Sequence, residues 1–280
     1  MSGALILPSV AILGGIGLAF GVIIAVAQRR LYVWEDPRID GVNDLLPGAN
    51  CGACGYPGCR AFAEATVTGA VTPAQCTVMG PDMREEVAHF LGVDAGAAVK
   101  RVARLLCAGG ADVAPFKATY TGIDSCAAAV AVGGGGKGCA WGCTGLGDCA
   151  VACTFDAITM GDTGLPLVNV DKCTACNDCV VACPLGLFTI MPLDHHLMVQ
   201  CRSLLSGEAA TSVCAVACNA CGRCVQDAAP GLIRMNAGLA IIDYDRIQLE
   251  DERALARCPT GAITWVDGAQ FQVLTAGGVN

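Results

Sequence analysis

The chain has 280 residues, among them 20 cysteines and 36 glycines, and a formal net charge of −8. An acidic chain without a lysine and arginine cluster argues against a nucleic-acid-binding protein. So many cysteines indicate disulfides or metal, and their tight C-x2-C runs favour metal over the disulfide framework of a small secreted protein. The length allows about one to three domains.

The first predicted element is a membrane span. Residues 3–27 carry no charged side chain, and a helix of that length, at about 1.5 Å per residue, can cross a bilayer. Arg29 and Arg30 follow at once, so the positive-inside rule places the rest of the chain on the cytoplasmic side. A signal peptide is the alternative, but its basic residues would precede a shorter apolar run. We expect a single-pass anchor in the cell inner (cytoplasmic) membrane that packs against other membrane subunits.

The next element is a glycine-rich loop that carries Cys51, Cys54 and Cys59. A helix and a loop then lead to Cys76, which we expect to be the fourth ligand. Four cysteines fit zinc or an iron–sulfur cluster. A zinc site would usually offer two C-x2-C knuckles, whereas three ligands crowd together here, so we expect a [4Fe–4S] cluster.

Two cysteine runs follow, and the second, Cys173-x2-Cys176-x2-Cys179-x3-Cys183-Pro184, matches the bacterial ferredoxin pattern. The first run is looser, and similar hydrophobic segments follow both, which predicts a two-cluster ferredoxin. In that fold the fourth cysteine of each run ligates the other cluster. The predicted ligand sets are Cys139, Cys143, Cys149 and Cys183 for one cluster, and Cys153, Cys173, Cys176 and Cys179 for the other.

A third cysteine run near the C-terminus is incomplete. One of its two expected ligand sets is all cysteine: Cys218, Cys221, Cys224 and Cys258. The other set falls on Ala228, Gln248, Asp251 and Ala254, none of which is cysteine. We expect a second ferredoxin fold that has lost one cluster; a leftover zinc knuckle is the alternative. The segment RIQLEDERALARC should form a helix whose Leu249, Leu255 and Arg257 stem fill the lost site.

Four cysteines remain outside these sets: Cys107, Cys126, Cys201 and Cys214. Free cysteine is a common small core residue, so we expect them in the core, with a fifth metal site as the alternative. The total is then about four [4Fe–4S] clusters. The glycine run at residues 133–138 is expected to be a flexible connector.

The order of anchor, LPGANCGACGYPGCRAFAEA with Cys76, and ferredoxin runs resembles the B subunit of the Rnf complex, an ion-translocating ferredoxin:NAD oxidoreductase. The resemblance covers nearly the whole chain, and the chain resembles the longer form of the family, which has a second ferredoxin unit near the C-terminus. The first module alone also resembles domains of corrinoid iron–sulfur proteins. It implies that the chain accepts electrons from reduced ferredoxin and passes them to membrane partners that carry flavins and clusters, while a separate subunit handles NAD.

The sequence therefore predicts an α+β protein with one transmembrane helix, a small helical 4Fe–4S domain and two ferredoxin-like units. The expected divisions are residues 1–27 (anchor), 34–93 (4Fe–4S domain), 94–128 (connecting segment), 129–193 (two-cluster ferredoxin) and 194–280 (second ferredoxin with one cluster lost). The expected function is one-electron transfer in an ion-translocating oxidoreductase, without catalytic side chains, because the clusters carry the redox chemistry. The alternative is a cluster-bearing docking or scaffold subunit that lies off the main electron path.

Overall fold

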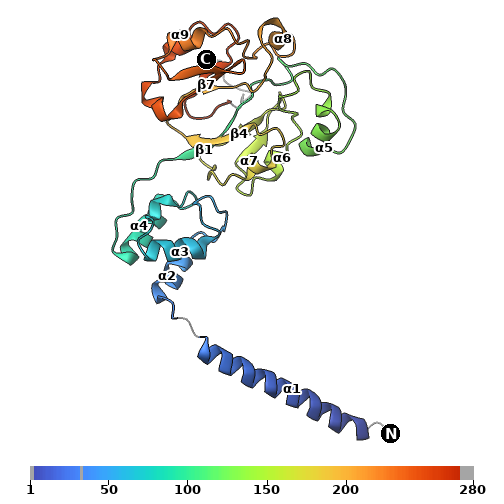
Figure 1. Cartoon of the computed structure of the whole chain (residues 1–280), viewed down its shortest axis with the longest axis vertical. Coiled ribbons are helices and arrows are strands. Elements are labelled where there is room, and N and C mark those ends of the chain that lie inside the picture. The colour runs from blue at the N-terminus through green and yellow to red at the C-terminus, as the bar shows by residue number, and fades with distance from the viewer. Residues whose placement is uncertain (1–2, 32–33, 272–280) are drawn as a thin grey trace, which may run out of the picture.

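The computed structural model describes residues 3–31 and 34–271, and they form a long helix, a small helical domain and a mixed body in chain order (Figure 1). This mixed α+β architecture confirms the predicted fold class. Helix α1 (Gly3–Arg30) covers the predicted span. It is the one helix among the described residues that is long and apolar enough to cross a membrane, and its segment Val10–Arg30 has no buried residue.

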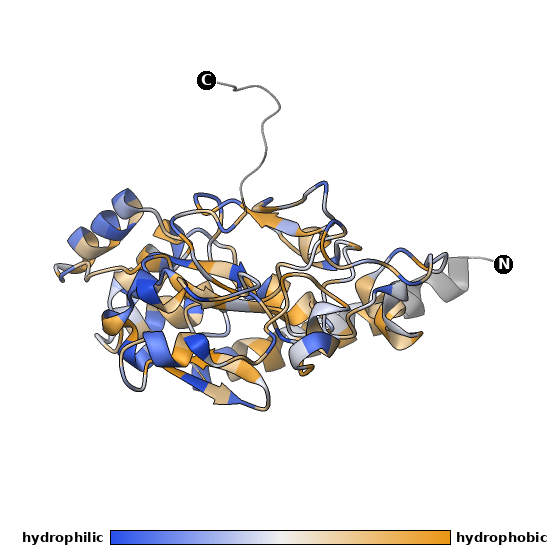
Figure 2. Ribbon diagram, turned by 90° about the horizontal axis from the view of Figure 1, so that it is seen from above, coloured by the Kyte–Doolittle hydropathy of each residue, from blue (hydrophilic) through white to orange (hydrophobic). Residues whose placement is uncertain are grey.

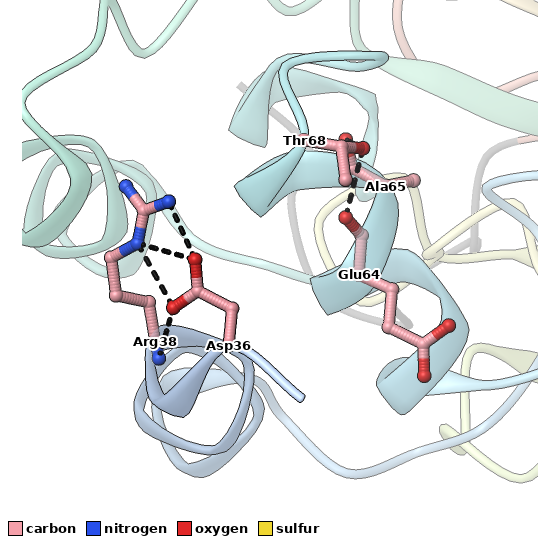
Figure 3. A network of polar contacts seen from close by, with 5 residues as sticks. All are labelled: Asp36, Arg38, Glu64, Ala65 and Thr68. Atoms are coloured by element: carbon pink, nitrogen blue, oxygen red, sulfur yellow. Dashed lines mark hydrogen bonds and ion pairs between the residues drawn. The ribbon is translucent and has the colours of Figure 1, made fainter. Parts of the chain in front are cut away.

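The small helical domain is built from α2 (Pro37–Leu45), α3 (Cys59–Val67), the 3₁₀ turn η1 (Pro73–Gln75) and α4 (Pro81–Leu91). Asp36 caps α2: its carboxylate accepts the Arg38 backbone N–H at 2.9 Å and pairs with the Arg38 guanidinium (Figure 3). At the end of α3, the Thr68 hydroxyl donates to the carbonyls of Glu64 and Ala65 (Figure 3). These caps fix both ends of the helical pair, and Cys59 is the first residue of α3.

The first ferredoxin unit is held by two small antiparallel sheets. Strand β1 (Arg101–Leu105) pairs with β4 (Phe188–Pro192), with Leu105 opposite Phe188, and β2 (Ile158–Met160) pairs with β3 (Pro166–Val168). The short helices α5 (Cys126–Ala131), α6 (Asp148–Val151) and α7 (Asp178–Ala182) lie between the strands along the chain. Because β1 lies in the segment expected to be a connector, this unit begins earlier in the chain than its cysteine runs.

The second ferredoxin unit repeats this arrangement. Strand β5 (Leu197–Val199) pairs with β8 (Ile263–Trp265), and β6 (Ile233–Asn236) pairs with β7 (Leu239–Ile242). Helices α8 (Gly207–Thr211) and α9 (Arg223–Asp227) complete the unit. In both units the first strand pairs with the last, and each unit has its own buried core. Figure 2 shows hydrophobic and hydrophilic residues interleaved along these short elements, as expected when several small cores share one chain.

The prediction of a helix over residues 246–258 is wrong. The structure has two 3₁₀ turns, η3 (Tyr244–Leu249) and η4 (Glu252–Ala254). Two acidic side chains explain the break: Asp251 caps η4 by accepting the Arg253 N–H, and Glu250 accepts the backbone N–H groups of His196 and Leu197. Leu249 is 44% exposed and fills no site. The residues that pack against the core here are Tyr244, Ile247, Leu255 and the buried Ala254.

The glycine run is packed against a neighbouring strand-like segment, so the predicted flexible connector is wrong as well. The carbonyl of Gly136 accepts the N–H of Lys117 at 2.7 Å, and the Gly138 N–H donates to the carbonyl of Pro115 at 3.0 Å. Gly136 has a φ of +78°, and a Cβ at this position would lie 2.1 Å from the carbonyl oxygen of Ala118. Glycine is therefore required here by a left-handed conformation and by close backbone contact.

Gly136→Ala should consequently destabilise the first ferredoxin unit by about 3 kcal/mol, because overpacking adds to the cost of the left-handed conformation. Gly134→Ala is the matched control, since Gly134 has a φ of +82° but open space where a Cβ would lie. It should cost only about 1 to 2 kcal/mol. Anaerobic guanidinium unfolding of the detergent-solubilised protein measures the difference. Equal losses in the two variants would contradict the packed geometry.

The C-terminal segment returns to the first unit and covers the free edge of β1. The Arg104 guanidinium, on a residue that is only 1% exposed, donates to the carbonyl of Gly268 at 2.6 Å. The Gln270 side chain accepts the Leu105 N–H at 2.8 Å and donates to the Leu105 carbonyl at 2.6 Å. The two ferredoxin units are therefore joined by hydrogen bonds as well as by the chain.

Candidate metal centres

The first cage lies in the small helical domain, where Cys51, Cys54, Cys59 and Cys76 line one hollow with about 330 Å³ of empty space. The loop is held by side-chain amides. Asn50 accepts the Cys59 N–H at 2.8 Å, and Gln75 donates to the Cys54 carbonyl at 2.9 Å. The structure thus brings together all four cysteines predicted for this site.

The second cage differs from the predicted set in one residue. Cys143, Cys149 and Cys183 line a hollow with about 360 Å³ of empty space, but the cysteine beside them is Cys126, while Cys139 lines another hollow. The prediction of Cys139 here therefore disagrees with the geometry, although Cys183 does lie across from its sequence neighbours. Burial, followed by repulsion from nearby thiolates, Cys126 among them, raises the pKa of Cys149 to about 12.

Asp148 explains how Cys126 reaches this cage. Its carboxylate accepts the backbone N–H groups of Cys126 at 2.8 Å and Ala127 at 3.0 Å, and the hydroxyl of Ser125 at 3.0 Å. Burial raises the pKa of Asp148, but these donors outweigh it and the pKa is lowered overall. The ionised carboxylate thus ties the start of α5 to the start of α6. No regular spacing in the sequence signals this ligand.

Asp148→Ala should accordingly release α5 and weaken the second cage, with a loss of up to about four irons per chain. Asp178→Ala is the matched control: Asp178 starts α7 as Asp148 starts α6, but the hydrogen bonds it accepts come from Thr154 at 3.4 Å and Cys176 at 3.3 Å. The control should keep its iron. Anaerobic iron and sulfide analysis measures both, and a greater loss in the control would refute the tether.

The third cage gathers Cys153 with Cys173, Cys176 and Cys179. Burial raises the pKa of Cys179 to about 12, with further contributions from the three other thiolates. Backbone N–H groups point at the sulfurs of the fourth cysteines: Ala157 donates to Cys153 at 3.3 Å, and Leu187 donates to Cys183 at 3.4 Å. Such N–H···S bonds stabilise thiolate charge and tune the reduction potential of a bound cluster.

The fourth cage lies in the second ferredoxin unit, where Cys218, Cys221, Cys224 and Cys258 line a hollow with about 340 Å³ of empty space. Burial and then repulsion among these thiolates raise the pKa of Cys224 to about 11. Burial also raises the pKa of Cys258, but backbone N–H groups, among them those of Ile263 and Ala262, lower it overall. The second ligand set expected in this unit contains no cysteine, and two of its residues, Ala228 and Ala254, pack against the core of the unit.

One further hollow, with about 310 Å³ of empty space, is lined by Cys107, Cys139, Cys201 and Cys214. All four are buried. The four cysteines left unassigned by the sequence are buried, as predicted for core residues, but three of them also face this hollow and Cys126 faces the second cage. Sequence spacing could not group them, since they come from four separate segments.

The spacing of the cysteine side chains distinguishes zinc from iron–sulfur chemistry. Within residues 3–31 and 34–271, no group of three or more cysteine, histidine or acidic side chains is close enough to hold a single metal ion. A zinc ion needs its sulfur ligands at about 2.3 Å. Four cysteines that line one hollow, but lie too far apart to share a single ion, instead fit a polynuclear cluster with one thiolate on each iron.

Comparison with known proteins agrees with this chemistry. Residues 46–78 match the family described as "Putative Fe-S cluster", and residues 166–189 match the 4Fe–4S binding domain. The B subunit of the Na(+)-translocating ferredoxin:NAD(+) oxidoreductase complex of Acetobacterium woodii is 41% identical over 264 residues, which cover 94% of this chain and 79% of the relative. The chain belongs to the family of Rnf complex B subunits.

Two other members of this family match over similar lengths. The B subunit of the ion-translocating oxidoreductase complex of Methanosarcina acetivorans is 36% identical, over 93% of this chain and 98% of its own. The B subunit of the proton-translocating ferredoxin:NAD(+) oxidoreductase complex of Clostridium ljungdahlii is 38% identical, over 92% of each chain. The resemblance to Rnf B subunits is thereby confirmed, including the longer form with an added ferredoxin unit.

Proposed function

We propose that this iron–sulfur subunit accepts electrons from reduced ferredoxin and relays them one at a time toward flavin- and NAD-linked partner subunits of an ion-translocating membrane complex. The names of two full-length relatives, which specify ferredoxin:NAD(+) oxidoreductase complexes, support this reading. The observation that carries it is the set of four-cysteine cages, because a chain with several such sites is suited to moving electrons from one site to the next.

The second and third cages lie next to each other, which favours a relay between them. Burial raises the pKa of Cys149 in the second cage, and repulsion from the nearby Cys179 thiolate of the third cage adds to this increase. The crossed arrangement produces this contact, since helices α6 and α7 each carry one of the two cysteines and pack together. Electron tunnelling slows steeply with distance, so adjacent buried sites are what a relay requires.

The ligand sets follow from the cages. We assign clusters to Cys51, Cys54, Cys59 and Cys76; to Cys126, Cys143, Cys149 and Cys183; to Cys153, Cys173, Cys176 and Cys179; and to Cys218, Cys221, Cys224 and Cys258. A bound [4Fe–4S] cluster supplies one-electron redox chemistry. The protein's own residues bury or half-bury most of these cysteines and direct backbone N–H groups at some of the sulfurs.

The same proposal places the chain in the cell inner membrane through α1, with the clusters on the cytoplasmic side. Arg29 and Arg30 end α1 and support this orientation. We divide the chain into this anchor, the helical domain at residues 34–93, and two ferredoxin units. The first unit begins at β1, because β1 and β4 form one sheet.

Ferredoxin-dependent NAD reduction by isolated membranes tests the relay. Deleting the chain should abolish the activity, and restoring the wild-type chain should recover it. Cys54→Ala should fail to recover it even when the complex assembles in normal amounts. Full activity with Cys54→Ala, or clusters whose EPR signals stay fixed during turnover, would instead support a docking or scaffold subunit.

A further inference from the structure

We propose that Cys107, Cys139, Cys201 and Cys214 hold a fifth [4Fe–4S] cluster, which joins the two ferredoxin units. None of these residues belongs to the other cages, and all four line one hollow. The presence of this cluster does not depend on the electron relay, whereas its role as a bridge rests on the proposed function.

Two of the ligands come from equivalent places in the two units. Cys107 follows β1 by two residues, and Cys201 follows β5 by two residues. The loops that carry them are tied together, because the Ala108 N–H donates to the Gln200 carbonyl at 3.0 Å. The repeated fold thus brings one cysteine from each unit to the line where the units meet.

The third ligand, Cys214, lies beside a glycine that keeps the hollow open. A Cβ on Gly109 would lie 3.1 Å from the Cys214 sulfur and 3.6 Å from the Cys107 sulfur. The segment with Cys214 is itself fixed to the first unit, since the Ala215 N–H donates to the Val113 carbonyl at 2.9 Å. Any side chain at Gly109 would crowd the two sulfurs.

A positive charge lies at the same hollow. The Lys137 ammonium donates to the carbonyls of Gly109 and Cys143, and Lys137 lines the hollow together with Cys139. Four thiolates around a [4Fe–4S] core carry net negative charge, which a nearby ammonium stabilises. Four unliganded thiols would gain little from that charge.

The hollow adjoins a cage on each side. Toward the first unit, the Cys143 N–H donates to the Cys107 sulfur at 3.5 Å. Toward the second unit, Cys201 lies in the same packed core as Cys218 of the fourth cage. A cluster here would thus close the gap between the second and fourth cages and make the second unit part of one continuous series.

Iron and acid-labile sulfide counts on the anaerobic, detergent-solubilised full chain test the site. The wild type should hold about twenty irons, which is about four for each of five clusters. Cys214→Ala should lose about four irons, and so should Gly109→Val, which removes no thiol. Ser203→Ala is the matched control, because Ser203 lines the same hollow but offers no thiol, and it should retain the wild-type count.

A wild type with about sixteen irons would overturn the proposal, whatever the variants do, and so would a Cys214→Ala protein with an unchanged count. The bridging role has its own readout: ferredoxin should reduce clusters on both sides of the hollow in the wild type and on one side in Cys214→Ala. A protein that holds twenty irons but shows no turnover would contradict the electron relay and would still support the fifth cluster.

Discussion

Cys183→Ala should remove the cluster held with Cys126, Cys143 and Cys149, and should spare the cluster held by its own sequence neighbours. The reason is geometric, because Cys183 lines the second cage and its sulfur accepts the Leu187 N–H there. The loss should be about four irons per chain, together with one EPR signal of the reduced protein.

Cys179→Ala is the matched comparison, since Cys179 lies only one helical turn away in α7 but faces the third cage. It should cost the same amount of iron but remove a different EPR signal. If both variants abolished the same signal, crossed ligation would be refuted, as it would by anomalous-scattering density showing Cys183 and Cys179 on one cluster.

Removing residues 1–33 should move the protein from the membrane to the soluble fraction without loss of iron. Helix α1 is exposed from Val10 to Arg30, and the first cage begins at Cys51. From Val10 to Arg30, α1 therefore contributes no buried residue to the helical domain or to the ferredoxin units.

A protease site inserted after Leu31 allows the comparison within one preparation. Before cleavage the brown protein should sediment with membranes or need detergent, and after cleavage the coloured fragment should remain in solution. A fragment that stays in the membrane, or that bleaches on cleavage under anaerobic conditions, would show that the anchor assignment is incorrect.

The sequence was sufficient where ligands lie close together in the chain. The loop from Cys51 to Cys59 and the run from Cys173 to Cys183 have spacings set by local turns, and the structure brings these cysteines together within their cages. The pairing of the first strand with the last in each unit is harder to predict from the sequence, because most of the unit's residues lie between β1 and β4 in the chain.

Sequence reasoning failed where a cage depends on distant loops. Cys126 reaches its cage through the carboxylate of Asp148, and Cys107 meets Cys201 because two repeated units pack together. Neither contact leaves a periodic signal. The helix expected over residues 246–258 failed for another reason: Glu250 and Asp251 satisfy backbone N–H groups outside a helix, which outweighs helix propensity.

The hydrogen bonds from Gln270 to β1 have a consequence for how the protein is made. A ribosome releases Leu105 long before Gln270, so β1 must wait with an open edge while more than half of the chain is synthesised. The hydrogen bonds that cover this edge of β1 therefore form later than the pairing of β1 with β4. A nascent chain that stops before Gln270 should therefore expose the edge of β1, where unpaired backbone N–H and C=O groups are open to pairing with another chain.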